Sequence, residues 1–187
     1  MASDADGAAA EAAPAKKDPV ASIAGQIPHL PTGQRAALRR MYLTQNRRPG
    51  DAAGVVMGLL HRAGVPQLDR IGEAAFARWS LLAHVAAVLS GTAAQTPHAP
   101  GRGLGRALWE AGYSENRQMR LTSARGPALD DQVRLAARFL AKAGKVPVNL
   151  WTIRDLIGGN PERAETARFT IARDFYDAGR AGRGDAQ

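Results

Sequence analysis

The sequence contains no cysteine, and it is poor in aromatic residues and in long apolar runs. The lack of cysteine excludes disulfides, thiolate catalysis and cysteine-based zinc sites, and it suits a reducing cytoplasm. The most apolar stretch, 71–89, is interrupted by Glu73, Arg78 and His84, so it falls short of the ~20 continuous apolar residues of a membrane span. We therefore expect a cytoplasmic protein that does not cross a membrane, with 71–89 as a buried central helix.

Residues that could carry catalysis or bind a metal are equally sparse. The histidines lie on separate predicted elements without the paired spacing of a metal site; they are His29, His61, His84 and His98. The carboxylates show no recurring acid–base arrangement. We predict a protein that is not an enzyme and that has no catalytic residues, no metal, no cofactor and no small-molecule substrate.

The glycine-rich segment 101–105, GRGLG, could suggest a phosphate-binding loop. No predicted strand precedes it, however, and its spacing matches neither the dinucleotide nor the P-loop pattern. We interpret it as a flexible lead-in to a helix, in which Arg102 is a candidate phosphate contact.

Acidic residues are outnumbered by basic ones, with 17 Asp and Glu against 25 Lys and Arg and a net charge of +8. Acids exceed lysines within residues 1–18, so the remainder is more basic than the total indicates. A partner that carries many phosphates is the first hypothesis. The alternative interpretation is that a GC-rich genome raises the Arg and Ala content together.

The apolar periodicity predicts an all-α protein of two small helical bundles. Residues 1–18 have no periodicity and are predicted to be a disordered leader, and 179–187 a disordered tail. The N-terminal bundle is expected at 19–96, with helices at 19–27, 33–43, 52–63 and a long one that Asp69 caps and that ends at Leu89. Residues 90–103 are rich in Gly, Pro, Thr and Ala and are expected to form a linker or mobile loop. The C-terminal bundle is expected at 101–178.

The stretch 104–125 predicts two short helices joined by a sharp corner. Gly112 stands where a left-handed C-terminal cap is expected, and Ser114 follows as the N-cap of the next helix. Trp109 is expected to pack between helices, with exposure to a partner as the alternative. This corner also carries an unusual amount of positive charge, from Arg106, Arg117, Arg120 and Arg125.

The segment 127–142 is the clearest amphipathic helix. Its predicted inner face consists of Leu129, Val133, Ala136 and Leu140. The far side carries Arg134, Arg138 and Lys142 at four-residue intervals without an acid between them, whereas a solvated face usually alternates in sign. We predict a track for phosphates here. Since no aromatic residues alternate with the arginines along the sequence, we expect contact with the backbone and not base stacking.

Other exposed cations extend this surface. The final helix should begin at Asn160 and Pro161, and Arg168 lies near its apolar line and is expected to pair within the bundle. The residues predicted to contact nucleic acid are Arg39, Arg40, Arg70, Arg102, Arg106, Arg125, Arg134, Arg138, Lys142 and Arg163.

The order of these segments resembles a known family. LGRAL at 104–108, a small-residue turn, Ser-Glu-Asn-Arg at 114–117 and a basic helix come first. ALDDQVRLAARFL at 128–140, Val-Pro-Val-Asn-Leu-Trp at 146–151 and ERAETARFTIARDFY at 162–176 follow. Over about 35–176 this order resembles the CasB family, the small subunit of the type I-E CRISPR surveillance complex Cascade.

The resemblance implies a non-catalytic subunit that is present in two copies. It implies contacts with the backbone subunits, the large subunit, the crRNA and a second copy of the same chain. It also implies that the protein binds the displaced strand of the target DNA. Because R-loop formation is nearly balanced in energy, nonspecific contacts with that strand can favour it.

Two alternatives remain open at this point. A free-standing helical DNA-binding protein could use 104–125 as a helix-turn-helix, although Asn116 and Gln118 are the only candidates there for reading bases. A protein–protein scaffold, in which the charge serves solubility only, would show no salt-sensitive binding of nucleic acid.

Overall fold

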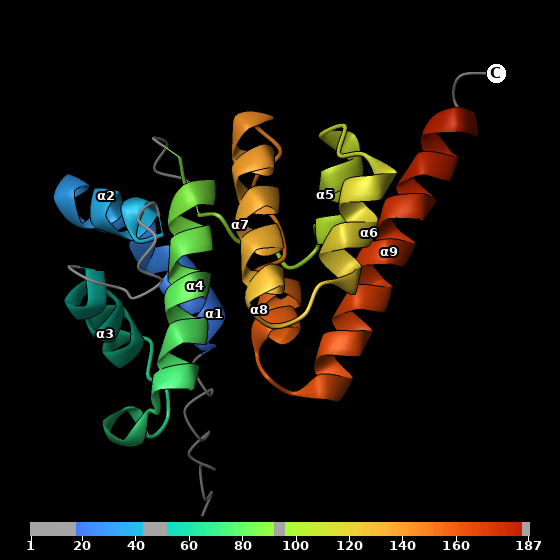
Figure 1. The fold of residues 1–187 in the computed structure, drawn as a ribbon. Coiled ribbons are helices and arrows are strands. Elements are labelled where there is room, and N and C mark those ends of the chain that lie inside the picture. Colours follow the sequence, from blue (N-terminus) through green and yellow to red (C-terminus); the bar gives the residue numbers. More distant parts are fainter. Residues whose placement is uncertain (1–17, 43–51, 92–95, 185–187) are drawn as a thin grey trace, which may run out of the picture.

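The computed structural model describes residues 18–42, 52–91 and 96–184, and the predictions for 1–17 and 185–187 lie outside these ranges. Within them the chain forms helices and loops, with no strand beyond one isolated bridge between His98 and Val148, so the predicted all-α class is confirmed. The elements of Figure 1 are α1 (Pro19–Gln26), a 3₁₀ turn (Ile27–His29), α2 (Thr32–Arg40), α3 (Ala53–Arg62), a second 3₁₀ turn (Leu68–Arg70), α4 (Glu73–Leu89), α5 (Leu104–Glu110), α6 (Glu115–Ser123), α7 (Gly126–Lys142), α8 (Leu150–Ile157) and α9 (Pro161–Gly184). No described helix is long and apolar enough to cross a membrane.

Local sequence signals set several helix ends. The Asp18 carboxylate accepts a hydrogen bond from the Val20 amide at 2.9 Å and so caps α1. Asn160 does the same for α9, accepting from the Arg163 amide at 3.0 Å. Gly112, after α5, has a φ of 79°, which a side chain rarely adopts. The N-cap predicted at Asn160 and the left-handed cap predicted at Gly112 are both present.

The prediction that Asp69 caps the long helix is wrong. Gln67 has a left-handed φ of 53°, and the backbone then closes a 3₁₀ turn in which the Arg70 amide donates to the Gln67 carbonyl at 3.0 Å. Ile71 is extended, so α4 begins only at Glu73, with Gly72 as its N-cap. This separate turn takes Asp69 away from the helix start.

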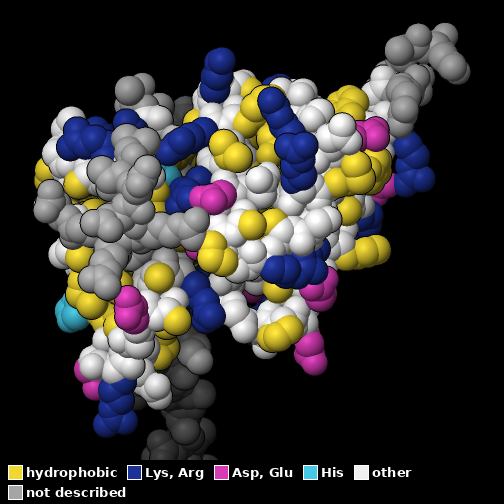
Figure 2. All heavy atoms as spheres, in the orientation of Figure 1, with side chains coloured by type: hydrophobic (Ala, Val, Ile, Leu, Met, Phe, Trp, Pro, Cys, Tyr) yellow, Lys and Arg dark blue, Asp and Glu magenta, His cyan; other side chains and the backbone are white. Residues whose placement is uncertain are grey.

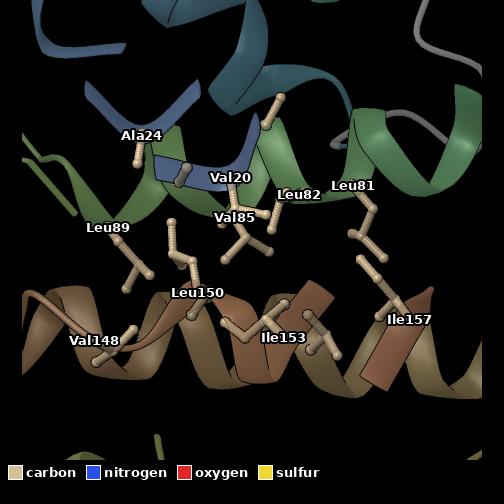
Figure 3. Close-up of a cluster of buried hydrophobic side chains, with 14 of the residues drawn as sticks. Val20, Ala24, Leu81, Leu82, Val85, Leu89, Val148, Leu150, Ile153 and Ile157 are labelled. Atoms are coloured by element: carbon tan, nitrogen blue, oxygen red, sulfur yellow. The ribbon is translucent and has the colours of Figure 1, made fainter. Parts of the chain in front are cut away.

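A continuous set of buried side chains runs through the described parts of both predicted bundles. In Figure 1, α4 and α7 lie side by side, with α1, α2 and α3 next to α4 and with α5, α6 and α9 beyond α7. Figure 3 shows Leu82, Val85 and Leu89 of α4 facing Leu150 and Ile153 of α8. Burial of this apolar surface is the main stabilising term. The division into two bundles stays a prediction, but their helices share this core.

The described part of the predicted linker is tied to a distant segment. The Val148 amide donates to the Pro97 carbonyl at 3.0 Å, and the Ala99 amide donates to the Val148 carbonyl at 3.0 Å. The Asn149 amide donates to the Arg102 carbonyl at 2.8 Å. These bonds fix 97–102 against 148–149 and lead the chain into α5.

The C-terminal helix is longer than its sequence pattern indicates. It continues beyond Ala178, where the predicted tail begins, as far as Gly184. The Trp109 indole of α5 lies against it, since a Cβ added at Gly179 would stand 2.9 Å from the indole nitrogen. Trp109 is still 36% exposed, so it packs between helices on one face only.

The crossing of α5 and α9 depends on Gly105. A Cβ there would overlap the Ile171 carbonyl and lie 2.8 Å from the Phe175 amide nitrogen. Both are backbone groups of α9, so they cannot move away without a shift of the helix. We expect Gly105→Ala to lower the free energy of unfolding by about 2 kcal/mol, measured by urea denaturation. Gly25→Ala is the matched control because that α1 glycine has open space around it. Equal stability of both variants would contradict the close crossing.

Candidate nucleic-acid interface

A groove lies between α6 and α7 and has a volume of about 360 Å³. Two of its cations come from α6, Arg117 and Arg120, and two from α7, Arg138 and Lys142. All four side chains are exposed. No Asp or Glu occurs among the described residues that line it, which are Tyr113, Arg117, Arg120, Gln132, Leu135, Arg138, Phe139 and Lys142. The groove is therefore a local concentration of positive charge. We call it the α6–α7 groove.

Aromatic and aliphatic side chains form the floor of the α6–α7 groove. The rings of Tyr113 and Phe139 meet edge to face at 5.0 Å between centroids. The Arg117 guanidinium carbon lies 5.6 Å from the Phe139 centroid and 6.0 Å from that of Tyr113. Burial raises the pKa of Tyr113, so its phenol stays protonated and adds no negative charge at neutral pH. Leu135 is 52% exposed.

Arg134 does not join the other two cations of the predicted track. A four-residue step in an α-helix drifts by about 40°, so Arg134 turns away from Lys142 towards α2 and α4. Its side chain is only 13% exposed, it forms an ion pair with Asp131, and its guanidinium carbon lies 4.7 Å from the centroid of the Tyr42 ring. Arg134 thus contributes to packing between helices, while Arg138 and Lys142 line the α6–α7 groove.

The predicted contacts on α2 differ from each other. Arg39 is half-buried and its Nε donates to the Ala87 carbonyl at 2.9 Å, which satisfies a carbonyl in the last turn of α4. Burial, with a smaller contribution from Arg35, lowers the pKa of Arg39. Arg40 is exposed.

Arg102 and Arg106 converge on one carboxylate. Glu110 lies 3.0 Å from a terminal nitrogen of Arg102 and 3.3 Å from the Nε of Arg106. Arg102 also donates to the Val146 carbonyl at 3.3 Å. It therefore ties the start of α5 to the segment before α8.

The remaining predicted cations are exposed and lie beside acids. Arg125 lies 2.9 Å from Glu165, and it also donates to the carbonyls of Thr122, Ser123 and Ala124 at the end of α6. Arg163 is 3.9 Å from Asp155, and Arg70 is 3.6 Å from Asp69. Exposed pairs of this kind are weak, so the cations remain accessible to a stronger anion.

Arg168 behaves as its position on the helical wheel predicts. Its side chain is almost fully buried, and it donates to the Glu165 carboxylate and to the Ala124 carbonyl, both at 3.2 Å. It belongs to the packing between α9 and the loop after α6.

His84 is a buried residue of α4. Its Nδ1 is 2.8 Å from the Leu38 carbonyl, which can only accept, so Nδ1 donates. Burial lowers the pKa of His84 to about 4, with a smaller lowering from Arg138 and Arg134. His84 is therefore neutral at neutral pH. Among the described residues, no group of three or more His, Asp or Glu side chains is placed to hold a metal ion.

The prediction from sequence left out two members of the groove as contacts. Arg117 and Arg120 stand at a three-residue interval on α6, and this spacing places them on one face. That signal marks them as neighbours, but their approach to Arg138 and Lys142 depends on how α6 packs on α7.

Figure 2 shows Lys and Arg side chains spread over the upper part of one face, over α2, α7 and α6, with apolar side chains between them.

The fold and this surface define a small all-α protein with a cationic groove and a shared helical core. A family model described as CRISPR-associated protein Cse2 matches residues 34–176, and the chain belongs to this family. The match confirms the resemblance noted above and makes the protein a member of the CRISPR-Cas type I-E Cascade subunits.

A solved structure supports the same fold. The chain is similar to the crystal structure of CasB from Thermobifida fusca, with a TM-score of 0.51 and 15% sequence identity. The alignment covers 82% of this chain and 97% of that one. No curated protein sequence matches the chain.

Proposed function

We propose that this protein is the non-catalytic small subunit of its Cascade complex and that the α6–α7 groove binds the phosphates of the displaced DNA strand. The observation that carries this proposal is the convergence of Arg117, Arg120, Arg138 and Lys142 on one groove whose described lining includes no acid. Guide pairing supplies the choice of sequence, so this subunit needs only contacts that ignore sequence. Arginine and lysine at the groove supply these contacts.

The same surface favours this function over a sequence-reading regulator. Of the two candidate base readers in 104–125, Gln118 is buried, at 1% exposure, and cannot reach a groove of DNA without unfolding its helix. Asn116 alone is exposed. Among the exposed side chains of 104–125, the cations Arg106, Arg117, Arg120 and Arg125 outnumber the single exposed amide, that of Asn116.

Contacts with the other subunits and the crRNA belong to the same proposal. On α9, Phe169 is 67% exposed, and Tyr176 stands two turns further along the same face and is also exposed. Together they give α9 an apolar surface that a protein partner could cover. We propose that α9 contributes to a contact with another Cascade subunit or with a second copy of this chain.

Titration of the purified protein with a labelled single strand at two salt concentrations tests the nucleic-acid part. With four phosphate contacts at about 0.7 each, the binding constant should fall about sevenfold when salt rises from 0.1 to 0.2 M. A constant that does not change with salt would contradict the proposal. A strong preference for one sequence would favour the regulator instead.

A further inference from the structure

The floor of the α6–α7 groove has a feature that a phosphate track does not require. Phosphates need only cations, yet Leu135 stands half-exposed among Arg117, Arg138 and Lys142. Together with the neighbouring aromatic rings, this leucine offers an apolar surface that a bare phosphate could not use but that an apolar part of a ligand could cover. The ligand that fits has apolar faces and negative charge at its edge.

We propose that the floor holds an unstacked base of a single strand while the surrounding cations hold its phosphates. The proposal rests on the proposed function and names what the groove takes in addition to phosphate. A nucleobase has two apolar faces, and it is attached to phosphates that the four cations can contact. In a duplex those faces are covered by neighbouring bases, so the site selects single strands.

The arrangement of Arg117 supports this assignment. Its guanidinium lies over the Tyr113 and Phe139 rings, at 6.0 and 5.6 Å from their centroids, and such planar groups stack on bases as they do on aromatic rings. Gln132, which also lines the groove, supplies an amide that can donate to or accept from a base. The volume of about 360 Å³ lies within the range of small-ligand sites. The fold therefore brings aromatic rings among the arginines although the sequence does not alternate them.

The test compares two labelled single strands of equal length, one with normal bases and one with abasic sites throughout, on the full-length protein. Both carry the same phosphates, so their salt slopes should agree. We expect the normal strand to bind about tenfold more tightly, as stacking of about one base would give. Leu135→Ala should remove most of this difference and leave the salt slope unchanged.

Met57→Ala is the matched control, because Met57 is an exposed apolar side chain on a different helix, α3. Its ratio of normal to abasic affinity should equal that of the parent. Since Leu135 is half-exposed, Leu135→Ala should keep the helical circular dichroism of the parent.

The outcomes separate the two proposals. Equal affinity for both strands, with normal salt dependence, overturns the base site and leaves phosphate binding intact. If neither strand binds in a salt-dependent way, both the base site and the phosphate site are overturned. If Leu135→Ala retains the tenfold ratio but fails to assemble with the other Cascade subunits, the groove is a protein contact and the base site is wrong.

Discussion

Replacing Arg120, Arg138 and Lys142 together with glutamate is expected to weaken the binding of single-stranded DNA about a hundredfold at 0.1 M salt. Each lost phosphate contact removes about 0.7 from the slope of log K against log salt, so three lost contacts remove about 2. At 0.1 M salt, a slope change of about 2 lowers the binding constant about a hundredfold. The three side chains are exposed, and exposed charges contribute little to stability. Fluorescence anisotropy over a range of salt measures both the affinity and the slope, and thermal unfolding checks that the fold is retained.

A second triple variant changes the net charge by the same amount but places the substitutions outside the α6–α7 groove. Arg62, Arg173 and Arg180 are exposed and do not line the α6–α7 groove, so replacing them with glutamate tests charge without touching the groove. This control should lose far less affinity than the groove variant. Equal losses in both would mean that overall charge, and not the α6–α7 groove, attracts the DNA.

Arg134→Glu is expected to destabilise the protein by about 3 kcal/mol. The Arg134 side chain is 13% exposed and is paired with Asp131, whose side chain is 45% exposed, so the substitution replaces a partly buried ion pair by two neighbouring carboxylates. It also removes the cation from the face of the Tyr42 ring. Urea denaturation monitored by circular dichroism measures the change in the free energy of unfolding.

Arg138→Glu provides the comparison, because Arg138 lies one turn further along α7 and is exposed. We expect it to change stability by less than about 0.5 kcal/mol while lowering DNA affinity. The reverse result, a stable Arg134→Glu variant that no longer binds DNA, would show that Arg134 points outward as its spacing predicts.

The sequence was sufficient for those features that depend on neighbouring residues. Gly112 ends α5 and Asn160 starts α9 because caps are formed within a few residues of the chain. The apolar side of α7 is also as predicted, since a period of 3.6 residues identifies an inner face without knowledge of the partner helix. The family resemblance likewise rested on the linear order of segments.

The features that depend on packing between helices could not be read in this way. Periodicity shows which residues of α7 face outward, but only the position of α2 and α4 decides that Arg134 is covered and Arg138 is not. The floor of the groove joins Tyr113, which precedes α6, to Phe139 on α7. Rings that are separated along the chain come together beside the arginines, and for this reason the sequence pattern favoured backbone contact alone.

The binding of the displaced strand by the α6–α7 groove is tested most directly by R-loop formation in reconstituted Cascade whose small subunit carries glutamate at positions 120, 138 and 142. Reactivity of the displaced strand towards a single-strand-specific chemical probe reports the open state. We expect the variant subunit to assemble, since the groove faces solvent, but we expect the complex to open target DNA poorly, with a larger defect as the salt concentration rises. Assembly of the variant complex with R-loop formation equal to that of the parent would show that the α6–α7 groove does not hold the displaced strand.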